Sequence, residues 1–151
     1  RGRVSGAAGV GVCEGTVGGQ AVAVTGDTMR IAGTTVRLDG IEAPDLRQTC
    51  RSASGRAWRC GTSAKSALAR LTGYETVTCE LTGAEDAQGH KVARCHMGET
   101  DLAAELAREG HVFAEAGFFS TYAAYEDEAR DARAGIWRGD AERPSSDRAQ
   151  K

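Results

Sequence analysis

The central part of the chain contains short apolar and β-branched runs separated by glycine-containing turns. Gly26-Asp27 and Ala32-Gly33 separate the first three runs, which predicts a meander of three strands. Two later runs flank the turn-rich segment 83–89 and predict a hairpin. The five expected strands cover residues 20–24, 28–31, 35–41, 76–81 and 92–97.

Apolar residues at helical spacing predict three helices among and after these strands. The first is expected to be capped by Ser63 and to end at Gly73, and the second to run from a Thr100 cap to Gly110. The third covers residues 122–132. Three meandering strands, a helix, a hairpin and then helices predict an α+β fold, a five-stranded OB-type β-barrel with three α-helices.

One folded unit accounts for the length of 151 residues. Residues 1–19 are rich in Gly, Ala and Val without periodicity, and residues 139–151 are polar and charged, so we expect both ends to be flexible. The folded domain is therefore expected to span residues 20–138. The chain begins at Arg1 without a signal peptide, as expected of a processed or trimmed form.

Composition narrows the classes of function. No apolar run approaches the length of a membrane span, so insertion into a membrane is not expected. The formal net charge of -2 provides no global positive field for binding nucleic acid. Any contact with nucleic acid must therefore be local.

The five cysteines form no C-x-x-C pair. Cys50 and Cys60 bracket a polar loop, and Cys79 and Cys95 would face each other across the predicted hairpin. Two disulfides are therefore predicted, which implies an oxidising compartment, periplasmic or secreted. A zinc site built from these cysteines is the alternative, and Cys13 is left over.

Four short segments share the order and spacing of a known family. They read TGDT at 25–28, VRLDGIEAPD at 36–45, DAQGH at 86–90 and GIW at 135–137. Together they resemble the staphylococcal nuclease (thermonuclease) family, which shows D-G-D-T, V-R-L-x-G-I-D-A-P-E, D-x-Y-G-R and G-[IL]-W. The segments QTC at 48–50 and WRCG at 58–61 also look similar to those of secreted or periplasmic members.

The resemblance implies a metal-dependent phosphodiesterase site. Such a reaction needs charge balance on the phosphate and an oriented water molecule. By resemblance, Asp27, Glu42 and the backbone carbonyl of Ala43 would bind Ca²⁺, which prefers hard oxygen ligands. Asp45 would orient the attacking water, and Arg37 would bind the phosphate.

The sequence departs from the family at several of these positions. Glu42 and Asp45 exchange the usual Asp and Glu, and His90 stands where active relatives have a second arginine. Gln88 replaces the usual tyrosine beside the substrate, and Phe118 lies in a loop where relatives place aromatics near the base. An imidazole is mostly neutral above about pH 6.5, so His90 should stabilise the transition state less well than arginine.

Each residue also has a simpler interpretation. Asp27 could be an ordinary turn residue, and Arg37 could pair with Asp39 or with a carboxylate on the next strand. The sequence thus predicts a monomeric, calcium-dependent phosphodiesterase that acts on DNA or RNA, preferably single-stranded, with reduced activity. The alternative is a catalytically degenerate module that binds an oligonucleotide or an envelope partner without cleavage.

Overall fold

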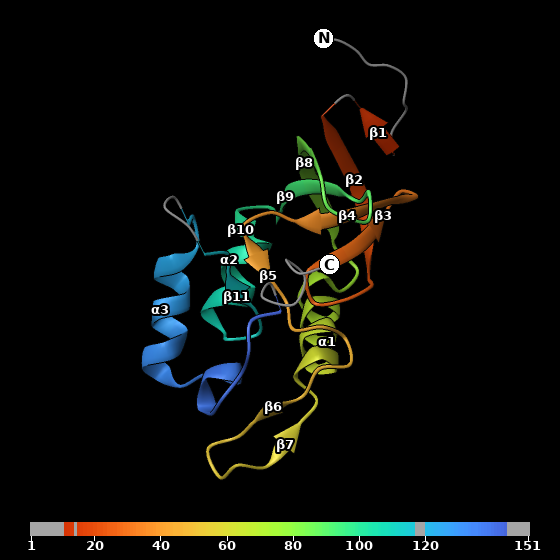
Figure 1. The fold of residues 1–151 in the computed structure, drawn as a ribbon. Coiled ribbons are helices and arrows are strands. Elements are labelled where there is room, and N and C mark those ends of the chain that lie inside the picture. The colour runs from red at the N-terminus through yellow and green to blue at the C-terminus, as the bar shows by residue number, and fades with distance from the viewer. Residues whose placement is uncertain (1–10, 14, 117–119, 145–151) are drawn as a thin grey trace.

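The computed structural model describes residues 11–13, 15–116 and 120–144. Its centre is a barrel in which β2 is bonded to β3, β3 to β4, β4 to β9, β9 to β8, and β8 again to β2 (Figure 1). Only the β4–β9 pair among these is parallel. The closed five-stranded mixed barrel confirms the predicted OB-type α+β fold. Its strands are β2 (Thr16–Ala23), β3 (Thr28–Ile31), β4 (Thr34–Leu38), β8 (Thr76–Glu85) and β9 (Lys91–Met97).

Shorter strands extend this frame. The predicted third strand, 35–41, is divided after Leu38, because Gly40 turns the chain at φ 84° before pairing resumes. Additional pairs form between β1 and β2, β10 and β9, β5 and β11, and β6 and β7. Their bounds are β1 (Gly11–Cys13), β5 (Ile41–Glu42), β6 (Cys50–Arg51), β7 (Ala57–Trp58), β10 (Thr100–Asp101) and β11 (Phe113–Ala114).

Within the described residues, three α-helices and one 3-10 helix accompany the barrel (Figure 1). They are α1 (Cys60–Thr72), α2 (Leu102–Arg108), α3 (Ala123–Ala132) and η1 (Gly135–Arg138). The predicted caps are wrong: α1 begins ahead of Ser63, at Cys60, and α2 is capped by Asp101 instead of Thr100. The Asp101 carboxylate accepts hydrogen bonds from the amides of Ala103 and Ala104, which satisfies the exposed end of α2. None of the described helices is both long and apolar enough to cross a membrane.

The barrel interior contains a predicted disulfide. Cys79 and Cys95 are opposed on β8 and β9, buried and bonded to each other. The surrounding core comes from all five barrel strands and from the inner faces of α1 and α2. Among its fully buried side chains are Val17, Met29, Ile31, Val36, Leu38, Leu68, Val77, Leu102 and Leu106.

A second apolar cluster surrounds the other disulfide. Cys50 is bonded to Cys60, and both pack with Phe113 and Ile136. Trp137 meets Phe113 edge-on with ring centroids 5.6 Å apart. Both predicted disulfides are therefore confirmed, and this one joins the β6–β7 hairpin to the start of α1.

The folded region is longer than the expected 20–138. Strand β2 begins at Thr16, and Val17 is fully buried in the barrel. At the other end, the Arg143 guanidinium donates hydrogen bonds to the Ala114 carbonyl and the buried Glu126 carboxylate. Residues 16–19 and 139–144 are thus part of the packed structure, because buried side chains and ion pairs hold them.

Candidate functional site

A cavity of about 970 Å³ collects most of the residues that the sequence analysis singled out. The residues come from the β2–β3 turn, β4, β5 with the segment that follows it, and the β8–β9 turn. Predicted site residues in its wall are Asp27, Arg37, Glu42, Asp45, Gln88 and His90. Ala43 is buried behind the wall, and Phe118 lies outside the described residues.

Asp27 is a buried carboxylate held by neighbours on both sides. One oxygen, Oδ1, accepts hydrogen bonds from the hydroxyls of Thr25 and Thr28, and the other, Oδ2, accepts the Ala43 amide at 2.8 Å. Gly26 permits this approach, because a Cβ at that position would meet the methyl groups of Ala43 and Ala64. These donors fix the direction of the carboxylate.

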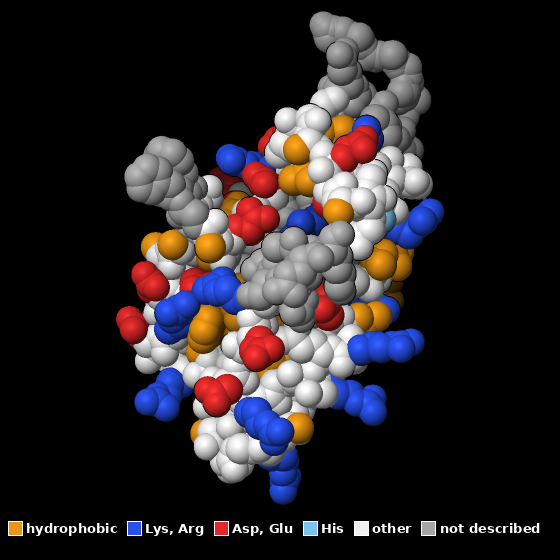
Figure 2. Space-filling view, in the orientation of Figure 1, with side chains coloured by type: hydrophobic (Ala, Val, Ile, Leu, Met, Phe, Trp, Pro, Cys, Tyr) orange, Lys and Arg blue, Asp and Glu red, His pale blue; other side chains and the backbone are white. Residues whose placement is uncertain are grey.

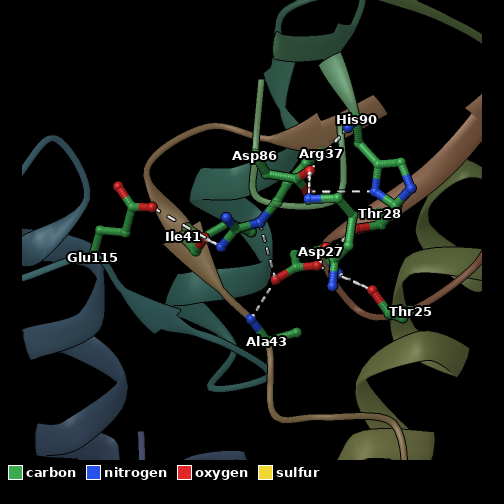
Figure 3. A network of polar contacts seen from close by, with 10 residues as sticks. Thr25, Asp27, Thr28, Arg37, Ile41, Ala43, Asp86, His90 and Glu115 are labelled. Atoms are coloured by element: carbon green, nitrogen blue, oxygen red, sulfur yellow. Dashed lines mark hydrogen bonds and ion pairs between the residues drawn. The ribbon is translucent and has the colours of Figure 1, made fainter. Parts of the chain in front are cut away.

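Arg37 lies between two carboxylates in the cavity wall (Figure 3). Its Nε is 3.6 Å from Asp27 Oδ2, and its Nη2 is 4.0 Å from Glu115 Oε2. The same Nη2 donates a hydrogen bond to the Ile41 carbonyl at 3.2 Å. Asp39, the other candidate partner, is instead 3.3 Å from Arg94 Nε.

The two exchanged carboxylates follow each other closely along the chain. Glu42 is buried on β5, whose pairing with β11 places it opposite Phe113. Asp45 is half-buried, and its amide donates to Oε1 of Gln48 in a tight turn. Both residues line the cavity, so the fold brings them to the same side of the barrel as Asp27.

The β8–β9 turn supplies the imidazole. Asp86 Oδ1 accepts the amides of Gln88 and His90, both at 2.9 Å, which shapes the turn. Its other oxygen lies 3.3 Å from Nδ1 of His90. Figure 3 shows this imidazole beside Asp86 and on the side of Arg37 away from Glu115. His90 is thus a cavity residue held by a carboxylate and is not merely an exposed turn residue.

Glu115 is a site residue that the sequence analysis missed. It follows β11, its amide donates to the Gly40 carbonyl, and its side chain lines the cavity opposite Arg37. Burial raises the pKa of its carboxyl, and the nearby acids Asp39, Glu42 and Asp27 add to the rise, whereas Arg37 opposes it. No motif marked the position, since only the β5–β11 pairing reveals that it faces Arg37.

The charge of this wall is strongly acidic. Among the described residues, five carboxylates line the cavity against one guanidinium and one imidazole. On the part of this face that the described residues form, Figure 2 shows acidic and basic side chains interspersed. The carboxylates are Asp27, Glu42, Asp45, Asp86 and Glu115.

The donor types in the wall fit a hard cation such as Ca²⁺. Asp27 and Glu42 are buried carboxylates that both line the cavity, and carboxylate oxygens are the ligands that calcium prefers. Within the described part of the chain, no three or more Asp, Glu, His or Cys side chains are grouped to hold a metal. A cation here would therefore depend on two carboxylates together with backbone oxygens and water.

The closed mixed barrel, the flanking helices and the arginine among carboxylates define a nuclease-like OB-fold domain. The chain belongs to the family of staphylococcal nuclease homologues, whose sequence profile matches residues 35–139. This membership supports a nuclease-type function and binding of nucleic acid in general terms. The two disulfides indicate an oxidising, extracytoplasmic compartment.

One relative is named for the biosynthesis of succinoglycan. The chain is 35% identical over 127 residues to the succinoglycan biosynthesis protein ExoI of Rhizobium meliloti (strain 1021). The match takes in 82% of this chain and 66% of the relative, so the chain spans just under two thirds of that protein's length.

Proposed function

We propose that this protein is a calcium-dependent phosphodiesterase that cleaves DNA or RNA, preferably single-stranded, at the cavity that Asp27 and Arg37 share. The observation that carries the proposal is the convergence of Arg37, Asp45 and His90 with two buried carboxylates in one cavity. Four segments contribute these residues: three lie within residues 27–45, and the β8–β9 turn brings His90 to them. The convergence therefore supports a role for the set as a whole.

The chain's own residues divide the work as follows. Arg37 has one guanidinium face held by Asp27 and Ile41, and its remaining donors bind a phosphate oxygen. Asp45, fixed by its turn with Gln48, orients water and accepts its proton. His90, held by Asp86, donates a hydrogen bond to the phosphate in place of the family's second arginine, while Gln88 and Phe118 contact the nucleotide.

Asp27, Glu42 and the Ala43 carbonyl would hold Ca²⁺, which would supply positive charge to the bound phosphate. The charge of the cavity supports this dependence. With five carboxylates against one guanidinium among its described residues, the wall repels a phosphate until a cation offsets it. Substrate binding, and not only cleavage, should therefore require the metal.

A second candidate function is a module that binds an oligonucleotide or an envelope partner without cutting it. His90 in place of arginine supports it, because loss of a comparable arginine in phosphoryl transfer costs roughly a thousandfold in rate. The relative named for succinoglycan biosynthesis is also compatible with an envelope role. Calcium binding without cleavage would favour this candidate.

The test is cleavage of single-stranded DNA and RNA by the purified, oxidised protein, with calcium and with chelator. A His90→Arg variant is measured beside it, and His90→Gln is its uncharged control. We expect calcium-dependent cleavage, a large gain for the arginine variant and a loss for the glutamine variant. If none of the three cleaves either substrate, the catalytic proposal is wrong and the binding module stands.

A further inference from the structure

A second cavity, of about 840 Å³, adjoins the catalytic cavity, and the two share Asp45. Its wall is formed by residues 45 and 47–51 together with residues 140–144. A substrate phosphate placed beside Asp45 would have its neighbour in the chain close to this second cavity. The charges of the two cavities differ, and that difference bears on what each can bind.

Counted over the described residues, the second cavity has three arginines against three carboxylates, whereas the first has one arginine against five. Two of the three arginines are already engaged by protein groups. Arg51 donates to the Gly55 carbonyl, and Arg143 donates to Glu126 and the Ala114 carbonyl. Arg47 is exposed, and in the described part of the chain it has no hydrogen bond or ion pair. Its guanidinium can therefore bind an anion without breaking an existing contact.

The turn that carries Arg47 is rigidly held. The Gln48 amide donates to the Asp45 carbonyl, and the Gly61 amide donates to the Gln48 carbonyl. Gly61 also has no space for a Cβ against the carbonyl oxygens of Asp45 and Leu46. The Cys50–Cys60 disulfide joins the two segments beside these contacts, so the backbone of Arg47 keeps a fixed position relative to Asp45.

We propose that this second cavity binds the phosphate that flanks the cleaved one, with Arg47 as its principal contact. The proposal rests on the function proposed above and specifies the substrate as a chain of at least two phosphates. A flanking phosphate is excluded from the acidic first cavity, whose charge a single cation would only partly offset. The Arg47 guanidinium supplies a forked pair of donors suited to phosphate oxygens.

The experiment compares two substrates in calcium. One is a short single-stranded oligonucleotide, and the other is an aryl ester of a nucleoside monophosphate, which has one phosphodiester and no flanking phosphate. We expect Arg47→Ala to lower kcat/KM for the oligonucleotide about tenfold and to leave the aryl ester unchanged. In Arg47→Ala, the slope of the logarithm of the oligonucleotide binding constant against the logarithm of salt concentration should fall in magnitude by about one. Arg47→Lys should restore this slope.

Arg30→Ala is the matched control, because Arg30 is exposed on β3 and lines neither cavity. Suppose that the unmodified protein cleaves the oligonucleotide, but Arg47→Ala changes neither the ratio of kcat/KM between the two substrates nor the salt dependence of oligonucleotide binding. The proposed subsite is then wrong, and the phosphodiesterase proposal stands. If the oligonucleotide binds with an Arg47-dependent slope but is not cut, the subsite stands and the catalytic proposal fails. If the oligonucleotide is neither bound nor cleaved, the proposed subsite and the phosphodiesterase proposal are both wrong.

Discussion

The carboxylate of Asp27 and the guanidinium of Arg37 lie side by side, with 3.6 Å between Oδ2 and Nε. Three further donors hold the carboxylate, and the Ile41 carbonyl holds the guanidinium. The pair is therefore positioned before any ligand arrives. Arg37 is mostly buried, so an altered Asp27 would leave a partly desolvated charge without its partner.

Asp27→Asn should therefore destabilise the fold and weaken calcium binding. The new amide group would point a donor at one of the groups that now donate to Asp27, at a cost of about 1–3 kcal/mol. Thermal unfolding and calcium titration measure the two effects. Asp39→Asn is the control, since Asp39 forms a more exposed pair with Arg94, and it should change both quantities little. Unchanged calcium affinity in Asp27→Asn would remove Asp27 from the metal site.

Glu115→Gln should increase the affinity for oligonucleotide. Glu115 is 4.0 Å from Arg37 and competes with phosphate for it, so removal of its charge frees the guanidinium. Because Glu115 is half-exposed, the gain should be small, about two- to fivefold. Fluorescence anisotropy in calcium checks this, with Glu75→Gln, an exposed acid that does not line the cavity, as control. Equal or weaker binding by Glu115→Gln would show that Glu115 does not restrain Arg37.

Loss of either disulfide should lower stability, but only the loss of Cys50–Cys60 should also disturb the site. Paired alanine substitutions should each cost about 2–5 kcal/mol in the free energy of unfolding. Removal of Cys50–Cys60 should also reduce cleavage at temperatures where the variant is folded, because that bond lies beside the contacts that hold the Asp45 turn.

The Cys79–Cys95 variant is the control for the disulfide experiment, because that bond lies inside the barrel. Its cleavage rate should match that of the parent while it is folded. Circular dichroism and cleavage assays over the same temperatures separate the two effects. Equal rates for both variants would contradict the positioning role of Cys50–Cys60.

His111 should make stability depend on pH. Burial lowers its pKa below the ordinary value of 6.5; Glu109 opposes the shift and Arg70 adds to it. The fold therefore favours the neutral imidazole, and this contribution is present above pH 6.5 and lost as pH falls through the lowered pKa. The melting temperature should fall more steeply in the parent than in His111→Gln between about pH 7 and about pH 5. Parallel pH curves would show that His111 does not carry the effect.

Much of the fold could be predicted because local signals agreed with the final structure. The glycine turns marked the barrel strands, and the equal distances of Cys79 and Cys95 from the hairpin centre marked their pairing. The caps of α1 and α2 were harder to predict, since Asp101 and Thr100 are both good caps and only the backbone geometry selects one.

The site was predictable where residues belong to sequence motifs. Asp27, Arg37 and His90 do, and the structure places them in one cavity. The place of Glu115 in the site could not be predicted from the sequence. It depends on the pairing of β11 with β5, and these short strands have little sequence pattern. Arg143 likewise lies in a polar segment whose contact with Glu126 no local signal predicts.

The parallel pairing of β4 with β9 also constrains when the cavity can be assembled during synthesis. Val36 is paired with Lys91, so a chain that emerges from the ribosome N-terminus first cannot complete the ring until β9 has been made. Until then Arg37 and His90 cannot line a common cavity. A product truncated before Lys91 would therefore lack the closed barrel and the assembled cavity.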